Sequence, residues 1–327
     1  MSFSKEVKEE LSKHYNNGRH CQIAEIAAII SLCGNISINL KDEYTIQVQT
    51  EILPMARKYF TLLKKTFNIN TEISVKRNKY FKNSNYLKRN KTYLLTVKNN
   101  KDSLQVLQAT KLLSDDGEIK ENLSVVSNLV VQNSCCKRAF LRGAFLAAGS
   151  ISDPAKAYHF EIATATNEKA NQIQEIFKVF DIDAKIVLRK KHYVVYIKEG
   201  SQIVEALNVM EGHIALMNFE NVRIVKEMRN SINRQVNCET ANINKTVIAS
   251  SKQLDDILYI QSQTGLGKLT ESLEEMARIR LEYPEASLKE LGQLLDPPIG
   301  KSGVNHRLRK LSIIADQIRE QKEEIKI

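Results

Sequence analysis

The sequence predicts an α+β protein in which a duplicated domain of helices and strands is followed by an all-α helix-turn-helix domain. One pattern of helices and strands is written twice in the first two-thirds of the chain, a basic helical segment follows, and the remainder has only helical periodicity. With 327 residues, the chain is long enough for more than one domain. The predicted divisions are a first half at 1–110, a second half at 111–220, a basic helical linker at 221–265 and the helix-turn-helix domain at 266–327.

Composition favours a folded protein with a polyanionic partner. The chain is 43% apolar and 26% charged, close to the averages for globular proteins, and its formal net charge is +10. The longest apolar run, IAEIAAIISL, contains Glu25 and is too short to span a membrane. The N-terminus lacks the pattern of a signal peptide. We therefore expect a cytoplasmic, nucleoid-associated protein that binds double-stranded DNA and no membrane.

The first copy of the repeat begins with an apolar helix at 21–34 that is closed by Gly34. Alternating strands at 36–40 and 44–50 come next, then a helix at 52–67, strands at 71–77 and 91–98, and a short helix from Asp102. The second of these helices has one apolar stripe, made of Met55, Tyr59, Leu62, Leu63 and Phe67.

The second copy repeats this order. An apolar helix at 135–149 ends at Gly149, and a strand at 157–164, a helix at 167–180, strands at 184–190 and 192–198 and a helix near 201–210 follow. Aligning Gly34 with Gly149 superposes the later elements, so the order α-β-β-α-β-β-α occurs twice and predicts a pseudo-twofold domain.

Three helices are predicted near the C-terminus. The first has a capping-box pattern at Ser272 and Glu275, and the second has another at Ser287 and Glu290. The buried stripe of the second helix is predicted to be Leu288, Leu291, Leu294 and Leu295. Two prolines and Gly300, which relaxes the backbone, form the turn DPPIG. Ser302 is expected to cap the third helix, which turns Val304, Leu308 and Leu311 back towards the second.

The opposite face of the third helix is the predicted DNA-reading surface. Asparagine and arginine read adenine and guanine edges, and a helix N-terminus suits phosphate. The candidate contacts of this domain are Ser287, Lys289, Lys301, Ser302, Gly303, Asn305, His306, Arg307, Arg309 and Lys310. An ordinary three-helix bundle with a solvated basic face is the alternative, and the turn is longer than the usual three or four residues.

Secondary contacts are predicted on basic turns and on the linker. The segment from Lys76 to Lys101 contains no acidic residue, the matching turn of the second copy is also basic, and the linker is a basic helix followed by an asparagine-rich connector at 237–246. The secondary candidates are Arg77, Lys79, Lys82, Lys88, Arg89, Arg189, Lys190, Lys191, Arg229 and Arg234. Such contacts would go mainly to phosphate, although a basic run is also typical of a solvated surface.

The five cysteines give no metal-binding pattern in the linear sequence. Cys21, Cys33, Cys135, Cys136 and Cys238 include no CxxC pair, and no histidine stands at zinc-finger spacing. We expect reduced thiols in the cytosol, with no metal, no other cofactor and no catalytic residue.

The segment LRGAFLAAG at 141–149 resembles a degenerate LAGLIDADG motif, and IAAIISLCG at 26–34 resembles it more weakly. In LAGLIDADG homing endonucleases, the two helices pack at a twofold axis and the acid before each final glycine holds a divalent metal. Cys33 and Ala148 occupy those positions here and offer no hard oxygen ligand, which argues against cleavage. Asp153 is either a displaced ligand or an acid before proline in a turn.

Almost the whole chain resembles the WhiA family of Gram-positive bacterial regulators. The resemblance rests on FLRGAFLAAGSISDP, FENVRIVKEMRNSINRQVNCETANINKT and SLKELGQLLDPPIGKSGVNHRLRKL. It implies a non-enzymatic DNA-binding regulator of transcription, cell division, chromosome segregation and sporulation, with the helix-turn-helix as its main DNA contact. The alternatives are a DNA-tethered adaptor that binds a protein partner through its N-terminal domain, and an active homing-type nuclease.

Overall fold

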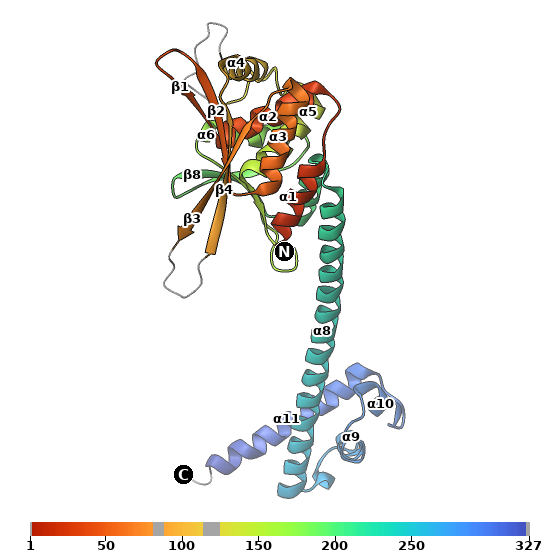
Figure 1. Cartoon of the computed structure of the whole chain (residues 1–327). Helices are drawn as coiled ribbons and strands as arrows, with labels where there is room; N and C mark the ends of the chain where they lie inside the picture. Colours follow the sequence, from red (N-terminus) through yellow and green to blue (C-terminus); the bar gives the residue numbers. More distant parts are fainter. Residues whose placement is uncertain (1, 81–87, 114–124, 325–327) are drawn as a thin grey trace. The chain divides into compact units, whose positions relative to one another are not determined.

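The computed structural model describes residues 2–80, 88–113 and 125–324 (Figure 1). The chain divides into two compact units between Glu227 and Met228. No helix among the described residues is long and apolar enough to cross a membrane.

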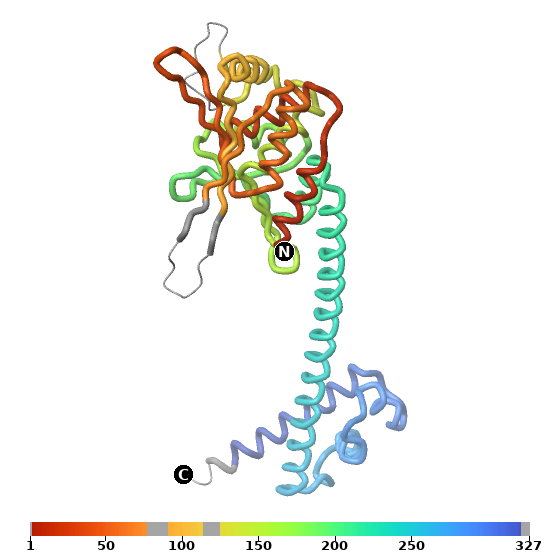
Figure 2. The backbone as a smooth tube through the Cα atoms, viewed as in Figure 1, coloured from red at the N-terminus to blue at the C-terminus, as the bar shows by residue number. Residues whose placement is uncertain are grey.

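The first unit contains the predicted duplication. After α1 (Phe3–Lys13), the first copy consists of α2 (Arg19–Cys33), β1 (Gly34–Ile38), β2 (Tyr44–Thr50), α3 (Leu53–Phe67), β3 (Glu72–Tyr80), β4 (Lys88–Val97) and α4 (Asn100–Ala109). The second consists of α5 (Ser134–Ala148), β5 (Gly149–Ile151), β6 (Phe160–Thr164), α6 (Asn167–Lys178), β7 (Lys185–Arg189), β8 (His192–Ile197) and α7 (Gly200–Val209). Figure 2 shows the two copies as the red-to-orange and the yellow-to-green parts of the backbone. The order α-β-β-α-β-β-α is therefore confirmed in both halves.

Each copy folds into one antiparallel four-stranded sheet. The strand orders, β1-β2-β4-β3 and β5-β6-β8-β7, are equivalent under the repeat. In β6, buried residues alternate with half-buried ones, which is the pattern of a strand with one face on the core. The predicted stripe of α3 is confirmed, because all five of its residues are buried in the same core.

Helices α2 and α5 pack against each other in the centre of the unit. Ala27, Ala28 and Ala144 are fully buried. A Cβ atom at Gly143 would lie 2.7 Å from the Glu25 carbonyl oxygen, so only glycine permits this approach of the two backbones. Small residues in both helices thus serve the contact that joins the two copies.

The second unit contains η1 (Leu266–Lys268), α9 (Glu271–Glu282), α10 (Leu288–Gln293) and α11 (Lys301–Glu324). α8 (His213–Gln263) begins in the first unit and ends in the second. The core of the second unit is formed by Ile257, Ile260, Leu273, Met276, Ala277, Leu291, Leu295, Val304, Leu308, Leu311 and Ala315.

Three local expectations differ from the structure. The asparagine-rich stretch at 237–246 was expected to be a connector. It is instead helical and belongs to α8, which continues through it without a break. α9 begins after Thr270, which places Ser272 inside the helix, and the predicted capping box at Ser272 is absent from this described segment. α11 begins at Lys301, so Ser302 lies in its first turn and does not cap it.

Candidate nucleic-acid interface

The interface is built on α11, whose buried stripe fixes the orientation of the helix. Val304, Leu308, Leu311 and Ala315 are at most 1% exposed. They share one core with Met276 of α9 and Leu291 of α10. Because residues advance by about 100° per position in an α-helix, this stripe turns Ser302, His306 and Arg309 to the opposite side.

The outward side of α11 is polar, basic and open. Lys301, Ser302, Asn305, His306, Arg309 and Lys310 are exposed. Within the described part of the chain, Asn305 and Arg309 have no hydrogen-bond or ion-pair partner, so both side chains are free to meet a ligand. The first turn of the helix contains no acidic residue. Its free backbone N–H groups and the positive end of the helix dipole suit a phosphate.

Arg307 does not lie on this open side. Its guanidinium donates a hydrogen bond of 3.3 Å to the Ser272 carbonyl oxygen and lies 3.7 Å from a carboxylate oxygen of Glu275. Its side chain is only 23% exposed. The structure therefore ties Arg307 to α9, and Gly303 is likewise half-buried, with its Cα facing the Ile299 side chain.

The start of α10 contributes Ser287 and Lys289. Ser287 forms the predicted capping box: its hydroxyl accepts the Glu290 N–H at 3.3 Å, and its own N–H donates to the Glu290 carboxylate at 2.7 Å. This accepted hydrogen bond lowers the pKa of the Glu290 carboxyl. Lys289 is exposed. Ser287 is thus a helix cap first, while the Lys289 ammonium is free to approach a phosphate.

A residue that the sequence analysis missed, Arg280, positions this helix start. Its side chain is buried, and it donates hydrogen bonds to the Ala286 carbonyl oxygen at 2.7 Å and to the Ser250 hydroxyl. A helical arginine in an ordinary charged segment gave no sign of this role. Lys245 was also missed: it lines a pocket of about 210 Å³ together with Asn305 and Ser287, and so adds a basic side chain from α8.

The turn between α10 and α11 depends on Gly292. A Cβ atom at Gly292 would lie 2.3 Å from the Ile299 carbonyl oxygen. The Ile299 N–H also donates a hydrogen bond of 2.9 Å to the Gly292 carbonyl oxygen. At Gly300, a Cβ atom would meet nothing within 4 Å. Gly300 also does not appear among the described residues with positive φ. The expectation that Gly300 relaxes the turn is therefore wrong, and close packing at Gly292 is what the turn needs.

The α10 stripe is shorter than expected. Leu291 and Leu295 are buried, Leu288 is half-buried, and Leu294 is 46% exposed because α10 ends at Gln293 and the following residues leave the helical path.

The secondary candidates lie in separate places. Lys190 and Lys191 form the exposed turn between β7 and β8, and the neighbouring Arg189 donates to Glu161 at 3.1 Å. Arg229 and Arg234 are exposed on α8, and Arg234 donates to the Asn230 carbonyl oxygen at 3.3 Å. The backbones of Arg77, Lys79, Lys88 and Arg89 lie in the paired strands β3 and β4, whereas Lys82 lies outside the described residues.

Of the two positions that would hold metal in a LAGLIDADG endonuclease, Cys33 lies in a cationic environment. The thiol of Cys33 donates to the Ile29 carbonyl at 3.1 Å and interacts electrostatically with the buried ammonium of Lys8. Burial lowers the pKa of Lys8 to about 8. Lys169 donates to the Ser31 carbonyl at 2.6 Å. Ammonium groups near Cys33 would repel a divalent cation.

Asp153 has the role of a turn residue. Its carboxylate accepts the Ala155 N–H at 2.9 Å, and its carbonyl oxygen accepts the N–H groups of Lys156 and Ala157. This geometry is that of an Asx turn.

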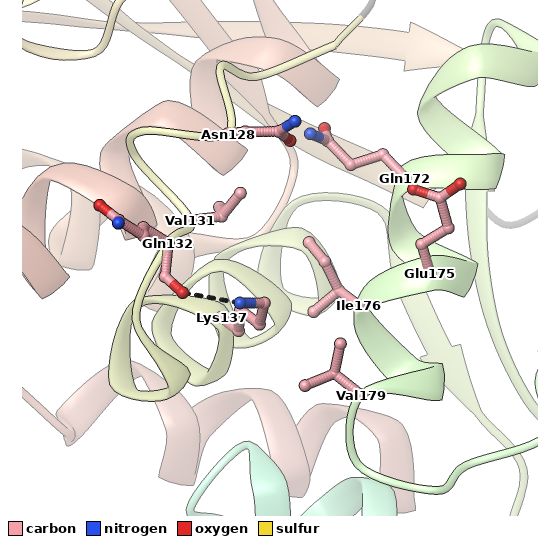
Figure 3. A pocket seen from close by; sticks show the side chains of 8 residues that line it. All are labelled: Asn128, Val131, Gln132, Lys137, Gln172, Glu175, Ile176 and Val179. Atoms are coloured by element: carbon pink, nitrogen blue, oxygen red, sulfur yellow. Dashed lines mark hydrogen bonds between the residues drawn. The ribbon is translucent and has the colours of Figure 1, made fainter.

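A pocket of about 340 Å³ lies between the segment around Asn128, α5 and α6 (Figure 3). Its polar groups serve the packing of that segment: Lys137 donates to the Gln132 carbonyl at 2.8 Å, and the Gln172 amide holds both backbone groups of Val126. The pocket therefore adds no side chain to the basic surfaces.

Three family models match the chain in order. They are the WhiA N-terminal LAGLIDADG-like domain at residues 19–113, the WhiA LAGLIDADG-like domain at 137–229 and the WhiA C-terminal HTH domain at 232–315. A "Probable cell division protein WhiA" from Lachnoclostridium phytofermentans is 62% identical over 320 residues, which are 98% of this chain and all of that protein. The chain belongs to the WhiA family. A second member, from Alkaliphilus oremlandii, is 46% identical over 98% of this chain and 99% of its own length.

The crystal structure of full-length DUF199/WhiA from Thermatoga maritima has the same fold. It is 24% identical, covers 97% of this chain and 99% of its own, and has a TM-score of 0.56. The expected fold, two LAGLIDADG-like copies followed by a helix-turn-helix domain, is confirmed by the WhiA models and by this structure.

Proposed function

We propose that this WhiA-family chain is a non-enzymatic, DNA-binding regulator of cell division, and that it also acts in chromosome segregation and, where present, sporulation. Its relatives are named as cell division proteins, and its third family model is a helix-turn-helix domain. In this proposal it works in the cytoplasm, associated with the nucleoid, and affects transcription there.

The observation that carries the proposal is the open face of α11. Asn305 and Arg309 are exposed, without partners among the described residues, and fixed in direction by the buried stripe beneath them. Their amide and guanidinium groups are those that read base edges in the major groove. Lys301, Ser302, His306, Lys310 and Lys289 surround them and would contact phosphate or neighbouring bases.

The residues with other duties take supporting roles in this proposal. Arg307 anchors α11 to α9, Ser287 caps α10, and Gly303 lies against Ile299 at the helix entrance. The basic groups of the first unit would add contacts to phosphate that depend weakly on sequence. The domain boundaries that we propose remain 1–110, 111–220, 221–265 and 266–327.

The test is DNA binding by an Asn305→Ala/Arg309→Ala variant of the full chain, measured by fluorescence anisotropy at fixed salt concentration. We expect the affinity for a cognate duplex to fall by about a hundredfold, since each good base contact contributes roughly 1–3 kcal/mol. Circular dichroism should show an unchanged fold, because neither side chain is buried. Unchanged affinity for the cognate duplex would overturn the assignment.

A nuclease is the competing function that the duplicated fold suggests. Cys33 and Ala148 supply no carboxylate, and Lys8 lies beside Cys33. We expect supercoiled plasmid to stay intact with the protein and Mg²⁺. Linear product that disappears in an Asp153→Ala variant would refute the non-enzymatic part of the proposal.

An adaptor is the second alternative, in which the first unit binds a protein of the transcription or division machinery and the second unit holds it on DNA. The two compact units, residues 1–227 and 228–327, prepared separately, would divide these tasks. Both functions expect DNA binding by the C-terminal piece, whereas only an adaptor would also show capture of a protein by the N-terminal piece.

A further inference from the structure

Four side chains with metal-binding atoms converge in the first unit, away from the DNA-reading face. His20 and Cys21 lie in the first turn of α2, and Cys135 and Cys136 lie in the first turn of α5. All four ligand atoms lie within 4.8 Å of one another. The His20 Nδ1 atom is 3.1 Å from the Cys136 sulfur, 3.3 Å from the Cys21 sulfur and 4.0 Å from the Cys135 sulfur.

The repeat explains why these residues meet. The alignment that places Gly34 on Gly149 also places His20 on Cys135 and Cys21 on Cys136, which are 115 positions apart. Because α2 and α5 pack closely, equivalent residues of the two copies face each other across the pseudo-twofold axis. Each copy therefore contributes one pair of adjacent side chains to a shared cluster.

The donor set and its spacing match tetrahedral zinc. Zn–S bonds of about 2.3 Å and Zn–N bonds of about 2.0–2.1 Å give tetrahedron edges of roughly 3.8 Å between two sulfurs and roughly 3.5 Å between sulfur and nitrogen. The three nitrogen-to-sulfur distances, 3.1, 3.3 and 4.0 Å, bracket that value. One histidine and three cysteines are among the ligand sets of structural zinc sites, and soft thiolates favour zinc over magnesium or calcium.

Burial raises the pKa of the Cys21 and Cys136 thiols, so a bound cation is needed to hold them as thiolates, and the helix ends assist it. Both cysteine-bearing turns are the N-termini of 15-residue helices, where unpaired N–H groups and the helix dipole stabilise negative charge. Cys21 and Cys136 are 3% exposed, which shields the bonds to the metal, while His20 and Cys135 are exposed and leave a path for entry.

We propose that His20, Cys21, Cys135 and Cys136 bind one zinc ion that joins the two copies of the repeat at the start of their central helices. Four protein ligands fill a tetrahedral shell and leave no open position, so the ion is structural and not catalytic. It cross-links segments far apart in the sequence, and its binding free energy adds to the stability of the first unit.

The first test is the zinc content of the purified full chain, grown with zinc, purified under reducing conditions and dialysed against a weak chelator. Mass spectrometry of the metal should give one zinc per chain. Cys21→Ser and Cys136→Ser should each lose it. Cys238→Ser is the matched control, because Cys238 is exposed on α8, and should retain one zinc. Wild-type protein that is folded and free of zinc, with no zinc uptake after demetallation, would overturn the proposal.

A second measurement covers the case in which the buried cysteine variants do not fold. Co²⁺ added to demetallated wild-type protein should give the visible and near-ultraviolet bands of a tetrahedral thiolate site, and His20→Ala, an exposed position, should weaken or alter them. Zinc should also raise the melting temperature of wild-type protein but not of His20→Ala. Co²⁺ spectra without thiolate bands would contradict the proposal.

Discussion

Arg142 shows how much one side chain contributes inside the central helix pair. It is fully buried and donates to Glu25 at 3.1 Å, to Asn16 at 2.8 Å and to Glu211. The Glu25 carboxylate also forms an ion pair with the buried Lys58, whose Nζ lies 3.1 Å from Oε1. The charges of α2, α5 and α3 thus neutralise one another where water is excluded, and each depends on its partners.

Replacing Arg142 with Met should destabilise the chain by about 3–5 kcal/mol, because the Glu25 carboxylate loses one of its two buried partners while the side-chain volume is largely kept. Urea unfolding followed by circular dichroism measures this. Arg138→Met on the same helix is the control: Arg138 is half-buried over the Phe180 ring, and its loss should cost less than about 1 kcal/mol. Equal effects of the two substitutions would show that the buried network has no special role.

Lys8→Met should raise the free energy of unfolding, in contrast to Arg142→Met. Burial lowers the pKa of Lys8 from 10.5 to about 8, so at pH 7 the folded protein holds an unfavourable charge. Below pH 8, Lys8 is protonated in both states and the substitution should stabilise by up to about 3 kcal/mol. Between pH 8 and 10.5, the unfolded chain binds more protons, wild-type stability rises, and the gain should shrink.

Urea unfolding at pH 7 and pH 10 tests this difference. Lys5→Met, an exposed lysine on the same helix, should give no gain at either pH. A loss of stability in Lys8→Met would mean that the ammonium makes favourable contacts, such as the one with the Phe145 ring, that outweigh its burial.

At the scale of elements, the packing of α10 and α11 requires a residue without a side chain at position 292. Gly292→Ala should destabilise the second unit by about 1–3 kcal/mol, since the added methyl group would overlap the Ile299 carbonyl oxygen at 2.3 Å. DNA affinity should fall with it, because α11 follows this turn. Thermal unfolding and anisotropy measure the two effects.

Gly300→Ala is the matched control in the same turn. A Cβ atom there has nothing within 4 Å, so stability should stay constant or rise by up to about 1 kcal/mol. A larger loss at Gly300 than at Gly292 would contradict this description of the turn.

The elements also show what local patterns predict. Hydrophobic periodicity located α3, the repeat and the α11 stripe, because each depends on residues that are neighbours in one element. Sequence could not place Arg307 against Glu275, since α9 and α11 meet only in the tertiary structure. It also missed the His20 and Cys21 cluster, because its ligands come from two copies and no linear spacing joins them.

For the whole molecule, the net positive charge predicts that DNA affinity depends on salt concentration and that basic groups of both units contribute to it. Lys190→Ala/Lys191→Ala removes two exposed charges of the first unit. If both contact phosphate, the slope of log affinity against log salt concentration should become less steep by about 2, with equal losses on all sequences. An unchanged slope would make that turn an ordinary solvated surface.

The central claim is that α11 reads DNA sequence, and the ratio of specific to non-specific affinity tests it most directly. A duplex selected by the wild-type full chain from a random library is compared with a scrambled duplex at one salt concentration. The wild-type ratio should be about a thousandfold or more, and Lys190→Ala/Lys191→Ala should keep it while both affinities fall. Asn305→Ala/Arg309→Ala should lower the ratio by about a hundredfold. An Asn305→Ala/Arg309→Ala variant that keeps the wild-type ratio would contradict the claim.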